Sequence, residues 1–220
     1  MGIMNTYREI LEKLPAHVGV PALLVGNWLF QGFIFAGTEE KVFKVSLELV
    51  LILIFFDVFD DVFQFNLILP AAIIIAHSIN WLCATNIWSV RIKKSSPTLG
   101  HARAVQVLDD LKNKLRSRDY FYGAAVFGSM CTGDFNNMSD IDAKLFRKRG
   151  LKNFILSYLF LISIRTEANI KKVPLDVYVE NNIENYSLKE GEVPIILFDP
   201  DRLLRRFYNK YKIYLCSHAA

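Results

Sequence analysis

Residues 125–129 read AVFGS and, after a polar loop, residues 140–145 read DIDAKL. An apolar run that ends in Gly-Ser predicts a buried strand followed by a turn. Asp140 and Asp142 are two residues apart on a second predicted strand, so both carboxylates point to the same face. Together they offer the hard oxygen ligands that Mg²⁺ prefers, while the Gly-Ser turn offers backbone N–H groups and a hydroxyl to an anion.

A third acidic side chain follows on a later predicted strand. In residues 173–179 (VPLDVYV), apolar and polar side chains alternate around Asp176. This period-two pattern buries the apolar flanks and leaves Asp176 on the opposite face. An isolated Asp-x-Asp pair is more often a solvated strand end or turn. The Gly-Ser turn before the pair and the third Asp after it favour a functional site.

Helix and strand patterns surround these motifs. Residues 101–118 carry apolar side chains at helical spacing, residues 194–199 read as one more short strand, and residues 202–211 read as an amphipathic helix. Asp199 lies beside Pro200 in a turn composition and is interpreted as structural. The predicted order is helix, strand, Gly-Ser turn, Asp-x-Asp strand, helix, Asp strand, strand, helix.

This order resembles the DNA polymerase beta-like nucleotidyltransferase superfamily, especially its minimal nucleotidyltransferase branch, over roughly residues 101–212. The resemblance implies an α+β fold, a small mixed β-sheet flanked by helices. It also implies a metal-dependent enzyme that transfers NMP from an NTP to an acceptor hydroxyl with two Mg²⁺ or Mn²⁺ ions. The implied catalytic and metal-binding residues are Asp140, Asp142 and Asp176, and the implied nucleotide-binding residues are Gly128, Ser129 and Lys144.

The sequence departs from this family directly after the Gly-Ser turn. Many minimal members carry Arg in an Arg-x-x-Gly turn, where this chain reads Met130-Cys131-Thr132-Gly133. Which residues bind the phosphates, and which nucleotide is preferred, therefore stay open. Lys144 and the cations of residues 147–149 are candidates for neutralising phosphates, with a charged, solvent-facing turn as the equal alternative.

The N-terminal part of the chain has a different composition. Residues 62–90 contain no Asp, Glu, Lys or Arg over 29 positions. At about 1.5 Å per residue this exceeds a hydrocarbon core of roughly 30 Å, which predicts a transmembrane helix. Residues 18–38 form a weaker second candidate of 21 residues, diluted by Gly, Pro and polar residues. Residues 45–56 are apolar but interrupted by Glu48, and are expected to lie in the interface, re-enter, or pack against the other helices.

Charge distribution orients the predicted spans. Arg91, Lys93 and Lys94 follow the long apolar stretch, which places the following residues in the cytoplasm. Two spans with the N-terminus inside form the simplest topology. We therefore expect the inner or plasma membrane, with a cytoplasmic catalytic domain. An acidic trio after the middle apolar segment is interpreted as a solvated helix face, with a site for a basic partner as the alternative: Asp57, Asp60 and Asp61.

Polar side chains within the long apolar stretch are costly in a membrane unless they are paired. They are interpreted as interhelical hydrogen-bonding groups rather than as a substrate site, and they permit a homodimer. These residues are His77, Ser78, Asn80 and Asn86.

The expected organisation is a membrane-associated helical region at 1–94, a Pro- and Gly-containing linker at 95–100, and a nucleotidyltransferase domain at 101–216. The net charge of +4 is modest and no basic-aromatic stripe is evident, so no nucleic-acid partner is expected. Three scattered cysteines are too few for a disulfide framework or a zinc cluster, which suits a reducing compartment.

The acceptor is the least determined part of this hypothesis. A bilayer-anchored enzyme suits a lipid-linked, glycan or protein acceptor, with cell-envelope glycan or lipid-linked synthesis as the first interpretation. A protein adenylyltransferase, as in the antitoxin-like members of the minimal branch, is a second interpretation. A non-catalytic membrane adaptor that only binds a nucleotide or a partner is a third.

Overall fold

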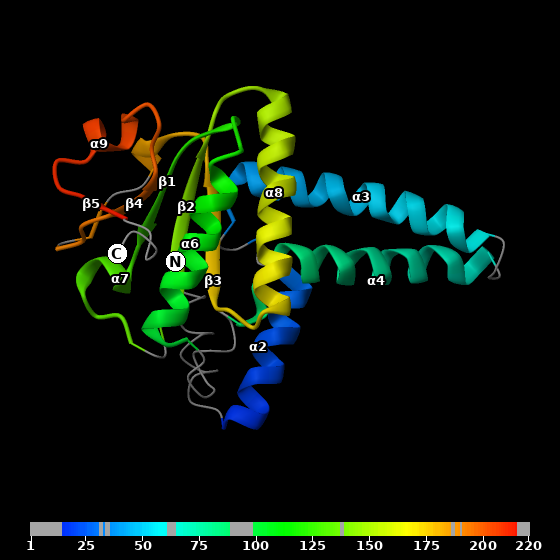
Figure 1. Cartoon of the computed structure of the whole chain (residues 1–220). Coiled ribbons are helices and arrows are strands. Elements are labelled where there is room, and N and C mark those ends of the chain that lie inside the picture. The colour runs from blue at the N-terminus through cyan, green and yellow to red at the C-terminus, as the bar shows by residue number, and fades with distance from the viewer. Residues whose placement is uncertain are drawn as a thin grey trace. The chain divides into compact units, whose positions relative to one another are not determined.

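The computed structural model describes residues 15–30, 33, 36–60, 65–88, 99–136, 139–185, 188–189 and 191–214. The chain divides into two compact units, Met1–Lys94 and Ser95–Ala220, whose elements are labelled in Figure 1. We call them the helical unit and the sheet unit. The functional assignment of these parts, with a linker at 95–100, stays a prediction. The basic cluster at residues 91–94 and Asp61 lie outside the described residues.

The sheet unit follows the predicted order of elements. It adds a one-turn helix after the Gly-Ser motif, a 3₁₀ turn and a short final strand. The elements are α6 (His101–Leu115), β1 (Phe121–Phe127), α7 (Ser129–Thr132), β2 (Ile141–Arg147), α8 (Leu151–Ile170), β3 (Leu175–Glu180), η1 (Ile183–Asn185), β4 (Ile195–Phe198), α9 (Leu203–Phe207) and β5 (Lys212–Ile213).

The final helix is shorter than the sequence pattern indicates. α9 has five residues instead of the ten expected at 202–211. The carboxylate of Asp199 accepts the N–H groups of Leu204 and Arg205 and so starts the helix. Tyr208 then takes an extended backbone and is buried in the core, which ends the helix. The structural interpretation of Asp199 is confirmed.

The five strands form one mixed sheet in the order β3-β2-β1-β4-β5. β1 is antiparallel to β2 and to β4, whereas β2 and β3, and also β4 and β5, run parallel. The α8 helix provides the crossover that a parallel β2–β3 pair requires. At the sheet edge, the buried Arg165 on α8 donates to the backbone carbonyl of Val177 on β3, at 2.6 Å. The expected α+β arrangement with a mixed sheet agrees with this architecture.

The two faces of the sheet are covered differently. α6 packs against β4, and α8 packs against β2 and β3. The opposite face is covered by α9 through one apolar cluster: Ala125, Phe127, Phe146, Ile196, Leu204 and Tyr208. Asp142 and Asp176 are directly paired in the β2–β3 register. They are half-buried, whereas Ile141 and Leu175 beside them are buried. The alternation predicted around Asp176 is therefore confirmed.

The described residues of the helical unit form α2 (Ala16–Phe30), α3 (Thr38–Asp60) and α4 (Phe65–Ala84), with a short helical stretch at 87–88. One sequence expectation changes. The weaker candidate span at 18–38 does not form one long helix, because α2 ends at Phe30 after 15 residues. The apolar segment at 45–56 belongs to a continuous helix of 23 residues that packs against α4, which is one of the alternatives expected for it.

One described helix is long and apolar enough to cross a membrane. It is the window Leu67–Ala84 of α4, with a mean hydropathy of 1.9. The window lies inside the 29-residue stretch singled out above, although the helix itself has 20 residues. Membrane localisation stays a proposal, which is taken up below.

Polar side chains of α4 bond to the neighbouring helices. The His77 Nδ1 lies 2.8 Å from Glu48 Oε1, and Asn80 Nδ2 donates to the backbone carbonyl of Lys44 at 3.0 Å. Trp28 Nε1 donates to Ser78 Oγ at 3.2 Å. Interhelical bonding is thus confirmed for His77, Ser78 and Asn80. Asn86 accepts a local bond from the N–H of Trp88, and its predicted interhelical bond stays a prediction.

Candidate active site

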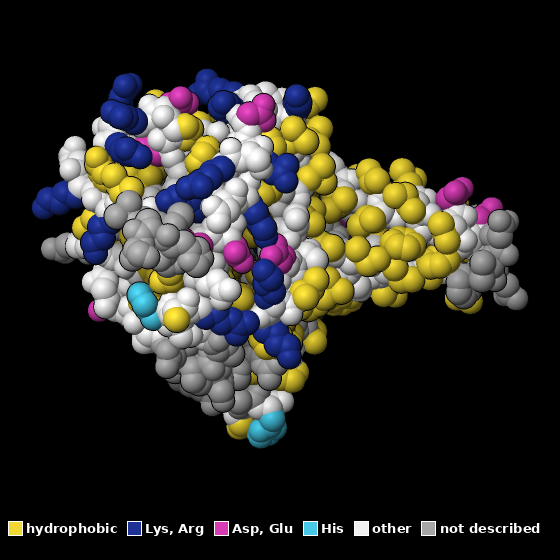
Figure 2. Space-filling view, viewed as in Figure 1, with side chains coloured by type: hydrophobic (Ala, Val, Ile, Leu, Met, Phe, Trp, Pro, Cys, Tyr) yellow, Lys and Arg dark blue, Asp and Glu magenta, His cyan; other side chains and the backbone are white. Residues whose placement is uncertain are grey.

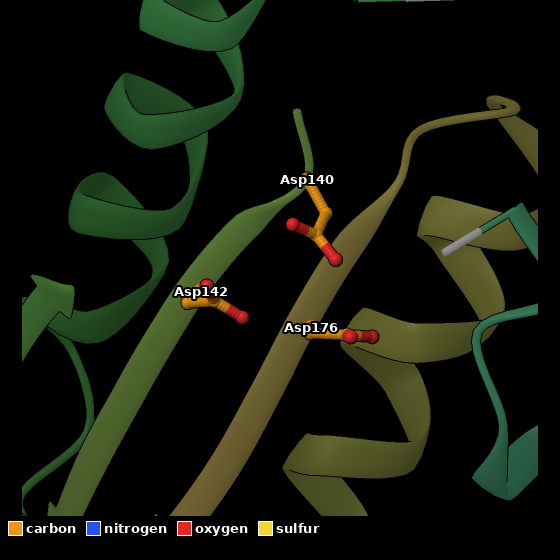
Figure 3. A group of neighbouring side chains, drawn as sticks. All are labelled: Asp140, Asp142 and Asp176. Carbon is orange, nitrogen blue, oxygen red and sulfur yellow. The ribbon is translucent and has the colours of Figure 1, made fainter. Parts of the chain in front are cut away.

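Three carboxylates meet at one end of the sheet. Asp140 directly precedes β2, Asp142 lies within β2, and Asp176 lies on the adjacent strand β3; Figure 3 shows the three side chains at the same end of the two strands. One oxygen from each carboxylate lies within 4.8 Å of the other two, and all three residues are half-buried. The structure therefore brings together the three residues that the sequence singled out. Their assignment as metal ligands stays a prediction.

The parallel pairing of β2 and β3 produces this convergence. Asp142 pairs with Asp176 in the register, and the N–H of Ile141 donates to the carbonyl of Pro174 at 2.9 Å. Parallel strands that start at the same sheet end place their first side chains together. Residues separated by more than thirty positions in the sequence thus become neighbours. An ionised carboxylate cluster of this kind is unfavourable by itself, because like charges at short range repel.

Gly128 approaches this cluster more closely than any other residue type permits. Its φ of 71° and ψ of −146° lie in a region that is essentially restricted to glycine. A Cβ atom built on Gly128 would collide with Oδ2 of Asp142. Phe127, the preceding residue, is the cross-strand partner of Asp142. The glycine of the Gly-Ser turn is therefore required by its conformation and by the space that Asp142 occupies.

The Gly-Ser turn differs in one respect from the expected anion cradle. The N–H of Gly128 donates to Oε1 of Glu192 at 2.6 Å. That amide is consequently engaged by a carboxylate of the protein itself and does not face an open anion site. Ser129 follows as the half-buried first residue of α7. Its hydroxyl stays a candidate phosphate donor.

Glu192 was not singled out from the sequence. It is 5% exposed, and its second oxygen accepts the N–H of Lys189 at 3.0 Å. One buried carboxylate thus ties the segment before β4 to the turn after β1. A lone Glu in a Gly-Glu-Val-Pro segment carries no spacing signal, and its partner Gly128 is 64 residues away. Only the tertiary fold identifies it.

Lys144 shares the sheet face of Asp142, two residues further along β2. Its ammonium lies 3.1 Å from Glu180 on β3, and both side chains are largely buried. The nucleotide-binding role of Lys144 stays a prediction. Among the cations at 147–149, Lys148 and Arg149 are exposed, whereas Arg147 is buried with its guanidinium over the Phe154 ring. Arg147 thus contributes to packing within the sheet unit.

The turn that departs from the family pattern is filled by a thiol. Met130 stands where the resemblance leads one to expect Arg, and it is half-buried. Cys131 is buried, and its Sγ donates to the carbonyl of Val126 at 3.0 Å. Burial is the main cause that raises the pKa of Cys131 from 9.0 to about 11. The thiol is therefore neutral near pH 7, and residues 130–133 supply no cation to the site.

Comparison with known families connects this geometry to a chemistry. Residues 108–200 match the family described as a nucleotidyltransferase domain. All six predicted site residues lie within the matched segment. No curated protein and no solved structure matched the chain. The match supports the nucleotidyltransferase superfamily for this part of the chain, and the mixed sheet with flanking helices is consistent with that fold.

Proposed function

We propose that this protein is a membrane-anchored, metal-dependent nucleotidyltransferase that moves NMP from an NTP to an acceptor hydroxyl. The observation that carries the proposal is the convergence of Asp140, Asp142 and Asp176 beside the Gly-Ser turn. The match to a nucleotidyltransferase domain over residues 108–200 supports the transferase class. Placement in the minimal branch rests on the sequence resemblance.

The donor set fits divalent cations. Three carboxylates supply the hard oxygen ligands that Mg²⁺ and Mn²⁺ favour. One oxygen from each carboxylate lies within 4.8 Å of the other two. The family resemblance implies two ions, which Asp140, Asp142 and Asp176 would hold. Bound ions would polarise the phosphates, stabilise charge on the entering and leaving oxygens, and relieve the repulsion among the three carboxylates.

The chain's own residues have distinct roles in this proposal. The acceptor oxygen attacks the α-phosphorus, the bond to the bridging oxygen breaks, and pyrophosphate leaves. Asp176 accepts the proton of the acceptor hydroxyl. Ser129 donates its hydroxyl to a phosphate oxygen, and the missing side chain at Gly128 lets the phosphates approach Asp142. Lys144 supplies positive charge on the same sheet face.

The helical unit is the proposed membrane anchor. The apolar window Leu67–Ala84 supports this role because it is long enough to cross a bilayer and only 28% of it is buried. We place the protein in the inner or plasma membrane with its sheet unit in the cytoplasm, where NTP and Mg²⁺ are available. A membrane-confined acceptor follows from that location, with a lipid-linked or glycan precursor as first choice.

Label transfer tests the proposal directly. Full-length protein in mild detergent is incubated with each of four α-³²P-labelled NTPs, Mg²⁺ or Mn²⁺, and native membranes. We expect label in a lipid or glycan fraction, absent in Asp142→Asn and present in Asp134→Asn, a matched change at an exposed residue. Label in protein would support the adenylyltransferase alternative. Nucleotide binding without transfer would support the adaptor, and no binding with either metal would refute the proposal.

A second readout does not depend on turnover. Because binding to the folded state alone stabilises it, Mn²⁺ at about a hundred times its Kd adds about 2.7 kcal/mol to the free energy of unfolding. We expect this stabilisation for the unaltered protein and for Asp134→Asn. It should disappear in Asp142→Asn and in Asp176→Asn.

A further inference from the structure

We infer that α3 and α4 enter the bilayer together as a helical hairpin, so that α3 is the partner span of α4. This inference deepens the membrane attachment proposed above and rests on it, but it is independent of catalytic activity. It replaces the sequence expectation of a first span at residues 18–38. The interaction surface is the outer face of the hairpin, and its partner is the hydrocarbon interior of a lipid bilayer.

The lengths of the two helices match a bilayer. α3 has 23 residues and α4 has 20, which correspond to about 34 Å and about 30 Å against a hydrocarbon core of roughly 30 Å. α2 has 15 residues and contains Pro21, and at about 22 Å it is too short to span. α3 and α4 pack on each other along their lengths and run antiparallel, since Lys44 lies beside Asn80 and Glu48 beside His77.

The outer face of the hairpin is apolar. Leu53 is 69% exposed and Ile74 is 57% exposed. Figure 2 shows hydrophobic side chains covering the hairpin, with acidic ones near its tip. The core helix of a water-soluble protein would bury such residues. The exposed bulky apolar residues are Val42, Val45, Leu49, Val50, Leu53, Ile54 and Val58 on α3, and Leu67, Leu69, Ile73, Ile74 and Leu82 on α4.

Three of the charged side chains of α3, Glu40, Lys44 and Glu48, face inward and are paired. Glu40 and Lys44 form an ion pair of 2.9 Å with both side chains at most 5% exposed. Glu48 meets His77 at 2.8 Å and also accepts from Asn80 at 3.3 Å. Charged groups inside a membrane typically face a helix interface and pair with one another. Sequence hydropathy counts these residues as costs without registering their partners.

Exposed charges on the hairpin lie toward its ends. Lys41 is exposed near the start of α3, and Asp57 and Asp60 are exposed in its last turn. Lys41 and Asp57 are about 24 Å apart along the axis, and the long Lys41 side chain extends this distance by reaching toward the headgroups. No charged residue occurs in Leu67–Ala84. The outer surface between these ends is therefore compatible with lipid chains.

The distribution of residue sizes favours lipid over a second copy of the chain. Membrane helix pairs place small residues at their shared interface. In α4 the inward positions Ile68, Ala72, Ala76 and Asn80 are spaced by four and are at most 1% exposed. The small-xxx-small pair Ala72 and Ala76 is thus already used within the hairpin. The outward positions carry the bulky Leu, Ile and Val side chains that lipid chains accommodate.

A hairpin has a topological consequence. Both its open ends lie on one side of the bilayer, and its acidic tip with Asp57 and Asp60 lies on the other. With the sheet unit in the cytoplasm, the tip is external, in keeping with the excess of Lys and Arg on the cytoplasmic side.

Side-specific labelling tests the inference. Single cysteines are introduced at Asp60, Ser117 and Leu53 in a full-length background whose native Cys83, Cys131 and Cys216 are replaced by Ala. Vesicles of both orientations are treated with a membrane-impermeant maleimide. We expect Asp60→Cys to react only from outside and Ser117→Cys, exposed in the sheet unit, only from the cytoplasmic side. Leu53→Cys should react only after detergent is added.

Each other outcome overturns a defined part. If Asp60→Cys and Ser117→Cys react from the same side, and Asp57→Cys gives the same result as Asp60→Cys, the hairpin does not cross the bilayer. Reaction of Leu53→Cys without detergent would place that face in water, and a Leu53→Cys disulfide dimer would assign it to a second copy. Protein that washes off membranes at alkaline pH would refute the anchor itself, whereas a membrane-integrated protein with the wrong sidedness would refute only the hairpin.

Discussion

The two units of the chain arrange polar and apolar groups in opposite ways. In the sheet unit, apolar side chains such as Leu108 and Phe146 are fully buried, and acidic groups collect at a partly open sheet end. In the helical unit, Glu40 and Lys44 are buried while Leu53 is 69% exposed. Polar groups need partners in both units, whereas the surroundings proposed for the two units differ. We propose water around the sheet unit and infer lipid around the helical unit.

The largest expected effect is a loss of nucleotidyl transfer by the sheet unit without a change in its fold. Asp142→Ala should lower the rate of label transfer by at least about a thousandfold, because it removes an oxygen ligand from the transition-state environment. The free energy of unfolding of the metal-free protein should stay constant or rise, since carboxylate repulsion is relieved. Rates and unfolding curves are compared with those of Asp134→Ala. Normal turnover by Asp142→Ala would rule out the assignment.

The next effect contrasts ion pairs in the two units. Lys44→Ala should destabilise the helical unit by about 3–5 kcal/mol, because it removes the positive member of a buried ion pair. Lys171→Ala removes a half-exposed partner of Asp110 and Glu167 in the sheet unit and should cost at most about 1 kcal/mol.

Tryptophan fluorescence measures the first of these changes selectively. All three tryptophans, at positions 28, 81 and 88, belong to the helical unit. Denaturant unfolding in mild detergent should therefore show the Lys44→Ala shift in the tryptophan signal, and the Lys171→Ala shift only by circular dichroism. Replacing both partners, Glu40→Gln with Lys44→Met, should recover most of the loss. Equal effects of Lys44→Ala and Lys171→Ala would remove the contrast between the units.

A third effect depends on pH and belongs to the sheet unit. The pKa of Cys131 is raised from 9.0 to about 11 by burial. The folded state therefore holds this proton more tightly than the unfolded state. The associated stability is complete below pH 9 and is lost as pH rises to 11, by up to about 3 kcal/mol. Cys131→Ala should flatten the fall in unfolding free energy over this range, measured by circular dichroism. Cys83→Ala, in the other unit, is the control and should leave the slope unchanged.

The smallest expected effect concerns Glu192. Glu192→Ala removes the carboxylate that holds the amide of Gly128. Because the Gly-Ser turn is then held less firmly in position, KM for the NTP should rise about tenfold, the equivalent of about 1.4 kcal/mol. Glu192→Gln should rescue only partly, because its NH₂ group cannot accept the second N–H. Steady-state kinetics separate KM from kcat, and Glu184→Ala is the exposed control. If only the fraction of folded protein changes, Glu192 has no positioning role.

Sequence reasoning located the acidic cluster because its signals are local. The spacing of Asp140 and Asp142 and the alternation around Asp176 each depend on one strand, and the parallel pairing that joins them follows from the element order. The role of Glu192 depends on its contact with Gly128, 64 residues away, and no local sequence pattern indicates it. The early end of α9 was missed because it depends on the burial of Tyr208 in the core, which is a tertiary contact.

The helical unit shows the same limit in another form. His77 and Asn80 were interpreted correctly as interhelical groups, because a polar side chain on an apolar helix needs a partner wherever it is. The length of α3 was missed because Lys44 and Glu48 interrupt its apolar sequence. The partners of the Glu48 side chain, His77 and Asn80 on α4, are 29 and 32 residues away. Pairing of this kind is a property of the fold.

The glycine at position 128 has a consequence for how this protein can vary. Asp142 fills the volume that any β-carbon would need there, and Glu192 holds the backbone on the other side. A saturation library at this codon should therefore contain no active clone except the synonymous ones, although no carboxylate has been touched. New specificity would have to arise from positions around the turn, with codon 128 left unchanged in every functional lineage.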